Sequence, residues 1–175
     1  MTGLQSLHKG LDKIGTWLNF IAIALLAVGL ACMVIIVFAQ VVFRFFHAGI
    51  PWSEEAARYI MIYLTFIGAS VGVKYKSHIA VEALIAALPI TGKKLAELVI
   101  DLLLLFAFYV LIRYGLSLVS GTMLQLSPAM RLPMGYIYFA LPLGGILMAF
   151  HTFVNILGDL INFGASPKAL EGGVE

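Results

Sequence analysis

The sequence has little charge and almost no cysteine. Only 11% of its 175 residues are charged, whereas 62% are hydrophobic and the mean hydropathy is +1.02. Such a chain has too few polar side chains to cover a soluble globule, so we expect lipid to cover it. The lone Cys32 has no second thiol to meet, which excludes an intrachain disulfide and argues against a metal–thiolate site. A net charge of only +2 gives no support to nucleic-acid binding.

Four apolar segments are long enough, or nearly long enough, to cross a membrane. A hydrocarbon core of ~30 Å needs about 20 helical residues. We therefore predict an all-α integral membrane protein with one four-helix domain over residues 1–165. Its expected transmembrane spans are 17–43, 52–73, 95–116 and 135–157. Pro142 is expected to kink the fourth span, which a membrane helix tolerates.

Two further segments are too short or too polar to cross. Ile79–Leu88 is apolar but is interrupted by Glu82 and followed by Pro89, so we predict a short interfacial helix or arm between the second and third spans. Residues 166–175 are predicted to form a disordered cytoplasmic tail.

The lysines predict the orientation in the membrane. With the N-terminus inside, the outer segments hold only Arg44, Arg58 and Arg131. The inner segments then hold every lysine of the chain, namely Lys9, Lys13, Lys74, Lys76, Lys93, Lys94 and Lys168. Cytoplasmic segments are usually the richer in positive charge. We therefore predict that both termini lie on the cytoplasmic side.

The densest polar cluster opens the second span. It consists of Trp52, Ser53, Glu54, Glu55 and Arg58. We expect Ser53 to cap the helix, and Glu54 and Arg58, four residues apart, to form an ion pair. One interpretation is a capped helix start that Trp52 anchors at the membrane interface. The other is a docking site for another membrane subunit, because one arginine cannot neutralise two acids and one carboxylate is left for a partner.

Small residues recur at four-residue spacing on two spans. Gly68 and Gly72 form such a face on the second span, and Gly145 and Ala149 on the fourth. These faces let helices approach closely, either within the bundle or against another subunit.

Ionisable residues inside the third and fourth spans leave several possibilities open. Asp101 and Arg113 are near enough to the span ends to reach the interfaces, or Asp101 meets a basic group on a neighbouring helix. His151 lies within a span, and His78 near the inner interface could approach it, which would allow a haem site.

Several segments together resemble the small membrane subunit of tripartite ATP-independent periplasmic (TRAP) transporters, the DctQ-like family. The segments that carry the resemblance are Phe43–Phe46, Trp52–Tyr59, Gly68–Ala69, His78–Val81 and Leu88–Pro89, with weaker support from Pro128–Pro133 and Tyr138–Gly144. The resemblance covers about residues 10–160. It implies an inner-membrane complex with a large subunit that carries substrate and sodium, and a periplasmic protein that delivers an organic acid. The small subunit would be a scaffold without cofactor, metal or catalytic residues.

On this basis we predict the contacts of the chain. The residues expected to contact the large subunit are Trp52, Glu54, Glu55, Arg58, Gly68, Gly72, His78 and Asp101. Arg44 and Arg131 have no acid within four residues and are predicted to dock the periplasmic binding protein. Two alternatives remain: a small self-assembling transporter or channel, and a haem-binding membrane anchor of a respiratory oxidoreductase with His78 and His151 as ligands.

Overall fold

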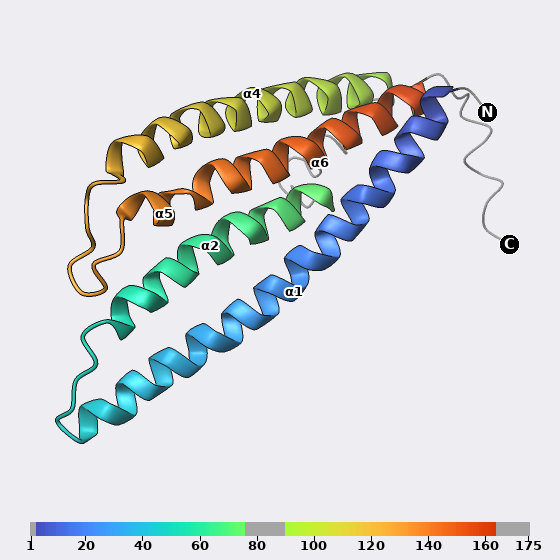
Figure 1. The fold of residues 1–175 in the computed structure, drawn as a ribbon. Helices are drawn as coiled ribbons and strands as arrows, with labels where there is room; N and C mark the ends of the chain where they lie inside the picture. Colours follow the sequence, from blue (N-terminus) through green and yellow to red (C-terminus); the bar gives the residue numbers. More distant parts are fainter. Residues whose placement is uncertain (1–2, 76–89, 164–175) are drawn as a thin grey trace, which may run out of the picture.

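Helices account for nearly all of the described chain. The computed structural model describes residues 3–75 and 90–163 (Figure 1). The helices are α1 (Gly3–Phe45), α2 (Ser53–Lys74), α4 (Ile90–Thr122), α5 (Met134–Tyr138) and α6 (Ala140–Phe163). The predicted interfacial arm at 79–88 and the predicted tail at 166–175 lie outside the described residues.

Four of the helices are long and apolar enough to cross a membrane. The crossing segments are His8–Phe45, Ser53–Lys74, Ala96–Thr122 and Met134–Gly158. Helices suit the hydrocarbon core of a membrane because each helix satisfies its own backbone hydrogen bonds, and no water is present there to do so. The predicted all-α fold with four membrane helices is therefore confirmed.

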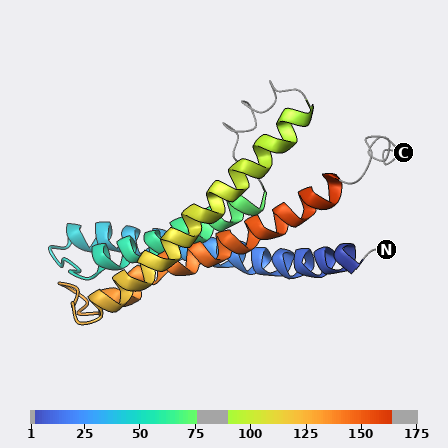
Figure 2. The same ribbon diagram turned by 90° about the horizontal axis from the view of Figure 1, so that it is seen from above.

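The helices form one twisted layer. In Figure 1 they follow the order α1, α2, α6, α4 across the view, and Figure 2 shows them diverging toward the end that holds the start of α1 and the end of α6. The pairs α1–α2, α2–α6 and α6–α4 lie side by side, and α1 also contacts α6. Half of the most apolar stretch of the segment Met134–Gly158, which comprises α5 and most of α6, is buried, against 6% of that of His8–Phe45. The inner helix of the layer is therefore α6, and α1 presents most of its surface outward.

Glycines set the close approach of the helices to α6. A Cβ atom added at Gly144 would lie 2.7 Å from the Cβ of Phe66 on α2, and one added at Gly145 would lie 2.9 Å from Ile112 Cγ1 on α4. The small-residue face that includes Gly145 therefore packs within the molecule. A cluster of apolar side chains fills the same region, with Val73, Phe108 and Met148 at its buried centre.

The kink expected at Pro142 lies three residues earlier, between α5 and α6. Proline has no N–H, so the carbonyl of Tyr138 loses its usual helical donor. Helical hydrogen bonds continue on both sides, from Phe139 N–H to Gly135 O (3.0 Å) and from Leu143 N–H to Phe139 O (3.2 Å). Gly115 of α4 packs against the proline, where an added Cβ would lie 3.0 Å from Pro142 Cδ.

The connection from α4 to α5 is a closed turn. Ser127 N–H donates to Leu132 O (2.9 Å), and Met134 N–H donates to Gln125 O (2.8 Å). Arg131, at φ 53°, adopts the left-handed conformation that reverses the chain. We call this connection, residues 123–133, the α4–α5 loop. It lies with the α1–α2 link at the end of the layer that we call the loop end, and the opposite end is the terminal end (Figure 1).

Candidate functional site

Glu55 ties the start of α2 to the α4–α5 loop. One carboxylate oxygen accepts the backbone N–H groups of Ala129 (3.0 Å) and Met130 (2.7 Å), and the other accepts the hydroxyl of Tyr59. Hydrogen bonds to an ionised acceptor are stronger than neutral ones. The Glu55 carboxylate is therefore held within the chain, and the interpretation that one acid of the cluster is left for a partner stays a prediction.

Ser53 does not cap α2 as expected. Trp52 already has helical backbone angles, which makes Ser53 the first helical residue. The Ser53 hydroxyl donates to the carbonyl of Ile50 (2.8 Å), and no side chain accepts a hydrogen bond from the first turn. This buried serine fixes the end of the α1–α2 link, and the neighbouring indole of Trp52 is about half exposed.

Glu54 and Arg58 form the ion pair that their spacing predicts. The two groups are 3.6 Å apart and both side chains are well exposed, so the pair is weak and can rearrange around a partner. An open cleft of about 500 Å³ lies beside them at the loop end. Its lining includes this pair together with Glu55, Tyr59, Pro128 and Met134.

One face of α2 is exposed along its whole length. We call it the α2 stripe, and it consists of Glu54, Arg58, Met61, Thr65, Ala69 and Gly72. Their spacing of three to four residues places them on one side of the helix. All are exposed except Gly72, which is half-buried. A surface intended only for lipid would be apolar and bulky, whereas this one carries charges, a hydroxyl and small residues, which favour helix–helix contact.

The two glycines predicted on α2 differ in their surroundings. A Cβ added at Gly68 would meet Leu26 of α1 at 3.7 Å, an ordinary packing contact within the molecule. A Cβ added at Gly72 would meet no described atom within 4 Å. Gly72 therefore leaves room on the α2 stripe, and Gly68 lies at the contact with α1.

The remaining predicted residues lie at separate places. Arg44 is exposed in the last turn of α1 and Arg131 is exposed in the α4–α5 loop, so both are at the loop end. Asp101 is half-buried on α4, and Arg113 is exposed further along the same helix. His78 lies outside the described residues. The structure therefore brings Glu54, Glu55 and Arg58 together at the loop end, with Asp101 on a different helix.

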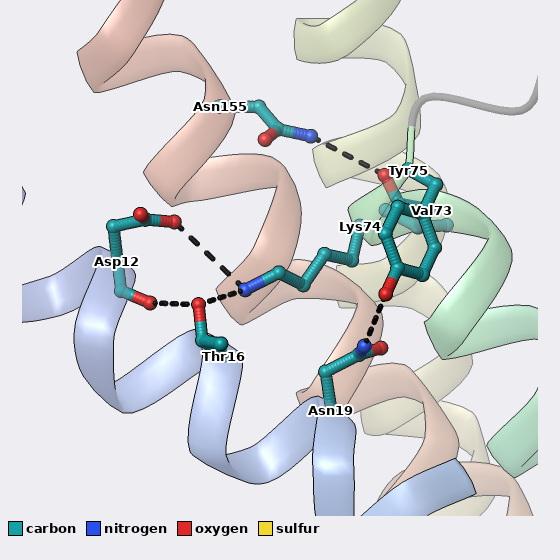
Figure 3. A network of polar contacts seen from close by, with 7 residues as sticks. All are labelled: Asp12, Thr16, Asn19, Val73, Lys74, Tyr75 and Asn155. Atoms are coloured by element: carbon teal, nitrogen blue, oxygen red, sulfur yellow. Dashed lines mark hydrogen bonds and ion pairs between the residues drawn. The ribbon is translucent and has the colours of Figure 1, made fainter.

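A polar network that the sequence did not reveal joins α1, α2 and α6 near the terminal end (Figure 3). The ammonium of Lys74, whose side chain is only 15% exposed, donates to Thr16 Oγ1 (2.8 Å) and lies 3.8 Å from Asp12. Asn19 donates to the hydroxyl of Tyr75 (3.0 Å). These contacts fix the last turn of α2 against α1.

The same network reaches α6. Asn155 donates to the carbonyl of Val73 (3.3 Å), one of the last carbonyls of α2. His151 and Thr152 are buried beside it, and the His151 ring packs edge-on against Phe150. Within the ranges 3–75 and 90–163, no three His, Cys, Asp or Glu side chains gather as a metal site would require. The contacts described here are structural, because they close the end of α2.

These features define a multi-pass membrane protein whose polar side chains form networks near the two ends of its helices. The sequence pattern of the family described as "Tripartite ATP-independent periplasmic transporters, DctQ component" matches residues 33–162. The chain belongs to this family, which confirms the resemblance. The members are transport components, not enzymes, and this membership favours a transporter subunit over a haem anchor.

Individual relatives agree with the family match. Two proteins of Haemophilus influenzae, each named "Putative TRAP transporter small permease protein", are 33% and 31% identical to the chain. The first alignment covers 75% of this chain and 82% of the relative, and the second covers 89% and 90%. The "Isethionate TRAP transporter permease protein DctMQ" of Oleidesulfovibrio alaskensis is 27% identical over 83% of this chain and 24% of its own length.

Proposed function

We propose that this small permease subunit is a scaffold that supports a large TRAP membrane subunit during sodium-coupled uptake of an organic acid. A periplasmic binding protein delivers the substrate. The complex lies in the inner membrane with both termini of this chain in the cytoplasm, so that the loop end faces the periplasm. The lysine distribution supports this orientation.

The observation that carries the proposal is the α2 stripe. It is a largely exposed, membrane-length face with small residues, and a Cβ added at Gly72 on it would meet no described atom within 4 Å. Small residues let a second helix approach closely, and the hydroxyl of Thr65 adds a polar group. The large subunit packs along this face, with Trp52 and Asp101 as further contacts. Glu55 acts indirectly by holding the α4–α5 loop beside the stripe, and His78, outside the described residues, completes the proposed interface.

The isethionate relative supports a larger partner. There, the part similar to this chain is 24% of one longer permease protein. A segment like this one can therefore belong to the same polypeptide as a much larger permease region. We infer that this chain occupies an equivalent place beside a large subunit.

Replacing Gly72 by leucine tests the interface. The added side chain would fill the space that the large subunit needs, so we expect much less large subunit to copurify in mild detergent. Gly121→Leu is the matched control, because a Cβ at Gly121 on α4 also meets nothing within 4 Å. Normal recovery with Gly72→Leu and a loss with Gly121→Leu would place the interface on α4 instead.

Uptake by the reconstituted complex tests the transport part of the proposal. Vesicles that contain both membrane subunits are supplied with the binding protein and with labelled C4-dicarboxylate or isethionate. We expect uptake of one such anion to require an inward sodium gradient. Equal uptake with and without that gradient would contradict sodium coupling.

A further inference from the structure

Four residues near the start of α1 form an exposed face with cations at one end and aromatic rings at the other. Lys9, Lys13, Trp17 and Phe20 follow each other at spacings of four, four and three residues, which places them on one side of the helix. Trp17 is 67% exposed and Phe20 is 71% exposed. We call these four residues the Lys–Trp face.

An open hollow of about 1130 Å³ lies against this part of α1, and its lining includes all four residues together with Asp12 and Thr16. This volume exceeds the roughly 300–1,000 Å³ of small-molecule pockets, and an open hollow of this size suits a lipid headgroup at a surface. Asp12, which also borders the hollow, lies 3.8 Å from the ammonium of Lys74 and so already has a cationic partner. Lys9 and Lys13 form no ion pair with any residue that the structure describes. The two ammonium groups are therefore available to an anion in the hollow.

The spacing along the helix matches the depth of a membrane surface. With a rise of ~1.5 Å per residue, Lys13 lies ~10 Å from Phe20 along the axis, and Lys9 lies ~6 Å further out. The headgroup layer on each side of a bilayer is about 5–8 Å thick. With Phe20 in the hydrocarbon and Trp17 at its boundary, Lys13 lies ~6 Å outside that boundary, at the level of the phosphates. Lys9 lies ~12 Å outside it, and its long side chain meets the outer side of the headgroup layer.

We propose that the Lys–Trp face is a binding site for an anionic phospholipid. The ammonium groups of Lys9 and Lys13 contact headgroup phosphates, Trp17 lies at the glycerol level, and Phe20 packs on an acyl chain. The two lysines are one turn apart, which suits a headgroup with two phosphates or two adjacent headgroups. Charge complementarity favours this occupant over a zwitterionic lipid. The site requires only that this segment meets a membrane surface, so it is independent of the proposed orientation and partner.

Quenching of Trp17 fluorescence tests the proposal on the purified full chain. The chain has two tryptophans, so Trp52→Phe leaves Trp17 as the only reporter. Phospholipids with brominated acyl chains are added in detergent micelles, and the anionic diphosphate lipid cardiolipin is compared with phosphatidylcholine. We expect cardiolipin to quench Trp17 at a lower mole fraction. An anionic surface attracts each lysine by ~1 kcal/mol, so Lys9→Gln should weaken this preference about five-fold and the double variant with Lys13→Gln about 25-fold.

Three controls make the result decisive. Arg113→Gln removes an exposed cation from α4 and should leave the preference unchanged. Inorganic phosphate at the same concentration should not displace the brominated lipid, and displacement would show a general anion site instead. A preference for cardiolipin that survives in the double lysine variant, or equal quenching by both lipids in the Trp52→Phe chain with both lysines present, would overturn the proposal. Unchanged thermal melting of the lysine variants, whose side chains are exposed, confirms that they fold.

Discussion

At the scale of single residues, Glu55 joins two parts of the fold. Its carboxylate accepts two backbone N–H groups of the α4–α5 loop and so links the start of α2 to that loop. Glu54, its neighbour, makes an exposed pair with Arg58. The two adjacent acids therefore have different roles, although the sequence places them in one cluster.

Replacing each acid separately tests this difference. Glu55→Ala should lower the melting temperature of the purified chain and speed proteolysis in the α4–α5 loop, because two backbone N–H groups lose their acceptor. Glu54→Ala removes the same charge and should change both quantities much less. Scanning fluorimetry and limited proteolysis measure the effects. Identical behaviour of the two variants would mean that Glu55 does not hold the loop.

The arginines of the loop end carry a second prediction at this scale. Arg44 and Arg131 are both exposed there, and exposed ion pairs of about 0.2–1 kcal/mol suit a binding protein that must leave after delivery. In reconstituted vesicles, Arg44→Gln and Arg131→Gln should each raise the binding-protein concentration needed for half-maximal uptake by up to about five-fold, with the maximal rate unchanged. Arg113→Gln serves as the control. Curves that coincide with the native one for both variants would rule out this docking role.

The cluster at the start of α2 also shows what residue spacing can predict. The Glu54–Arg58 pair follows from a separation of four residues within one helix. The partners of Glu55 in the α4–α5 loop lie 74 and 75 residues away, and those of Lys74 lie on α1. No local pattern indicates such contacts, because they depend on how the helices pack. The prediction that Ser53 caps α2 was wrong. Trp52 already has helical backbone angles, so Ser53 lies inside the helix and not at the capping position before it.

At the scale of elements, close helix contacts depend on glycines of α5 and α6. A Cβ added at Gly135 would lie 2.8 Å from the backbone oxygen of Val119 and 2.6 Å from Met123 Sδ. A backbone atom cannot move aside as a flexible side chain can, so α4 and α5 would have to separate.

We therefore expect Gly135→Ala to destabilise the chain by about 1–3 kcal/mol, the usual cost of overpacking. Gly121→Ala, where an added Cβ meets nothing within 4 Å, should have little effect or stabilise the helix slightly. Unfolding in mixed micelles measures both variants. A Gly135→Ala chain as stable as the native one would show that the two helices are not in close contact.

The length of α1 was the least predictable property of an element. From hydropathy, the first span was predicted to begin at Trp17, whereas α1 begins at Gly3. Hydropathy detects only the part that lipid must cover, and a helix can continue into water while its backbone hydrogen bonds and contacts support it. Here Asp12 and Thr16 contact Lys74 beyond the expected start.

At the scale of the whole molecule, the orientation in the membrane is open to a direct test. In a Cys32→Ala background, single cysteines at Ala48 and Ala129, both exposed at the loop end, should react with an impermeant maleimide added to intact spheroplasts. A cysteine at Gly10, near the terminal end, should react only after lysis, which controls for its accessibility. Labelling of Gly10→Cys in intact spheroplasts would reverse the orientation.

The number and order of the membrane helices could be predicted, but their arrangement could not. Each span is identified by its own apolar length, as for Tyr59–Val73 between Arg58 and Lys74. Which helices touch depends on matching surfaces, such as Gly144 against Phe66, that lie far apart in the chain. The sequence therefore predicts four spans, but it does not indicate that they form a single layer with α6 inside it.

The single layer has a mechanical consequence for the surrounding bilayer. Four helices side by side are wide in one direction and thin in the other. If the layer tilted in the plane that contains its four helices, the bilayer would have to thicken or thin along its full width. Each ångström of mismatch between protein and bilayer thickness costs a fraction of a kcal/mol. A partner fixed to the broad face would gain that resistance to tilting. The layer would then hold its partner at a fixed tilt in the membrane.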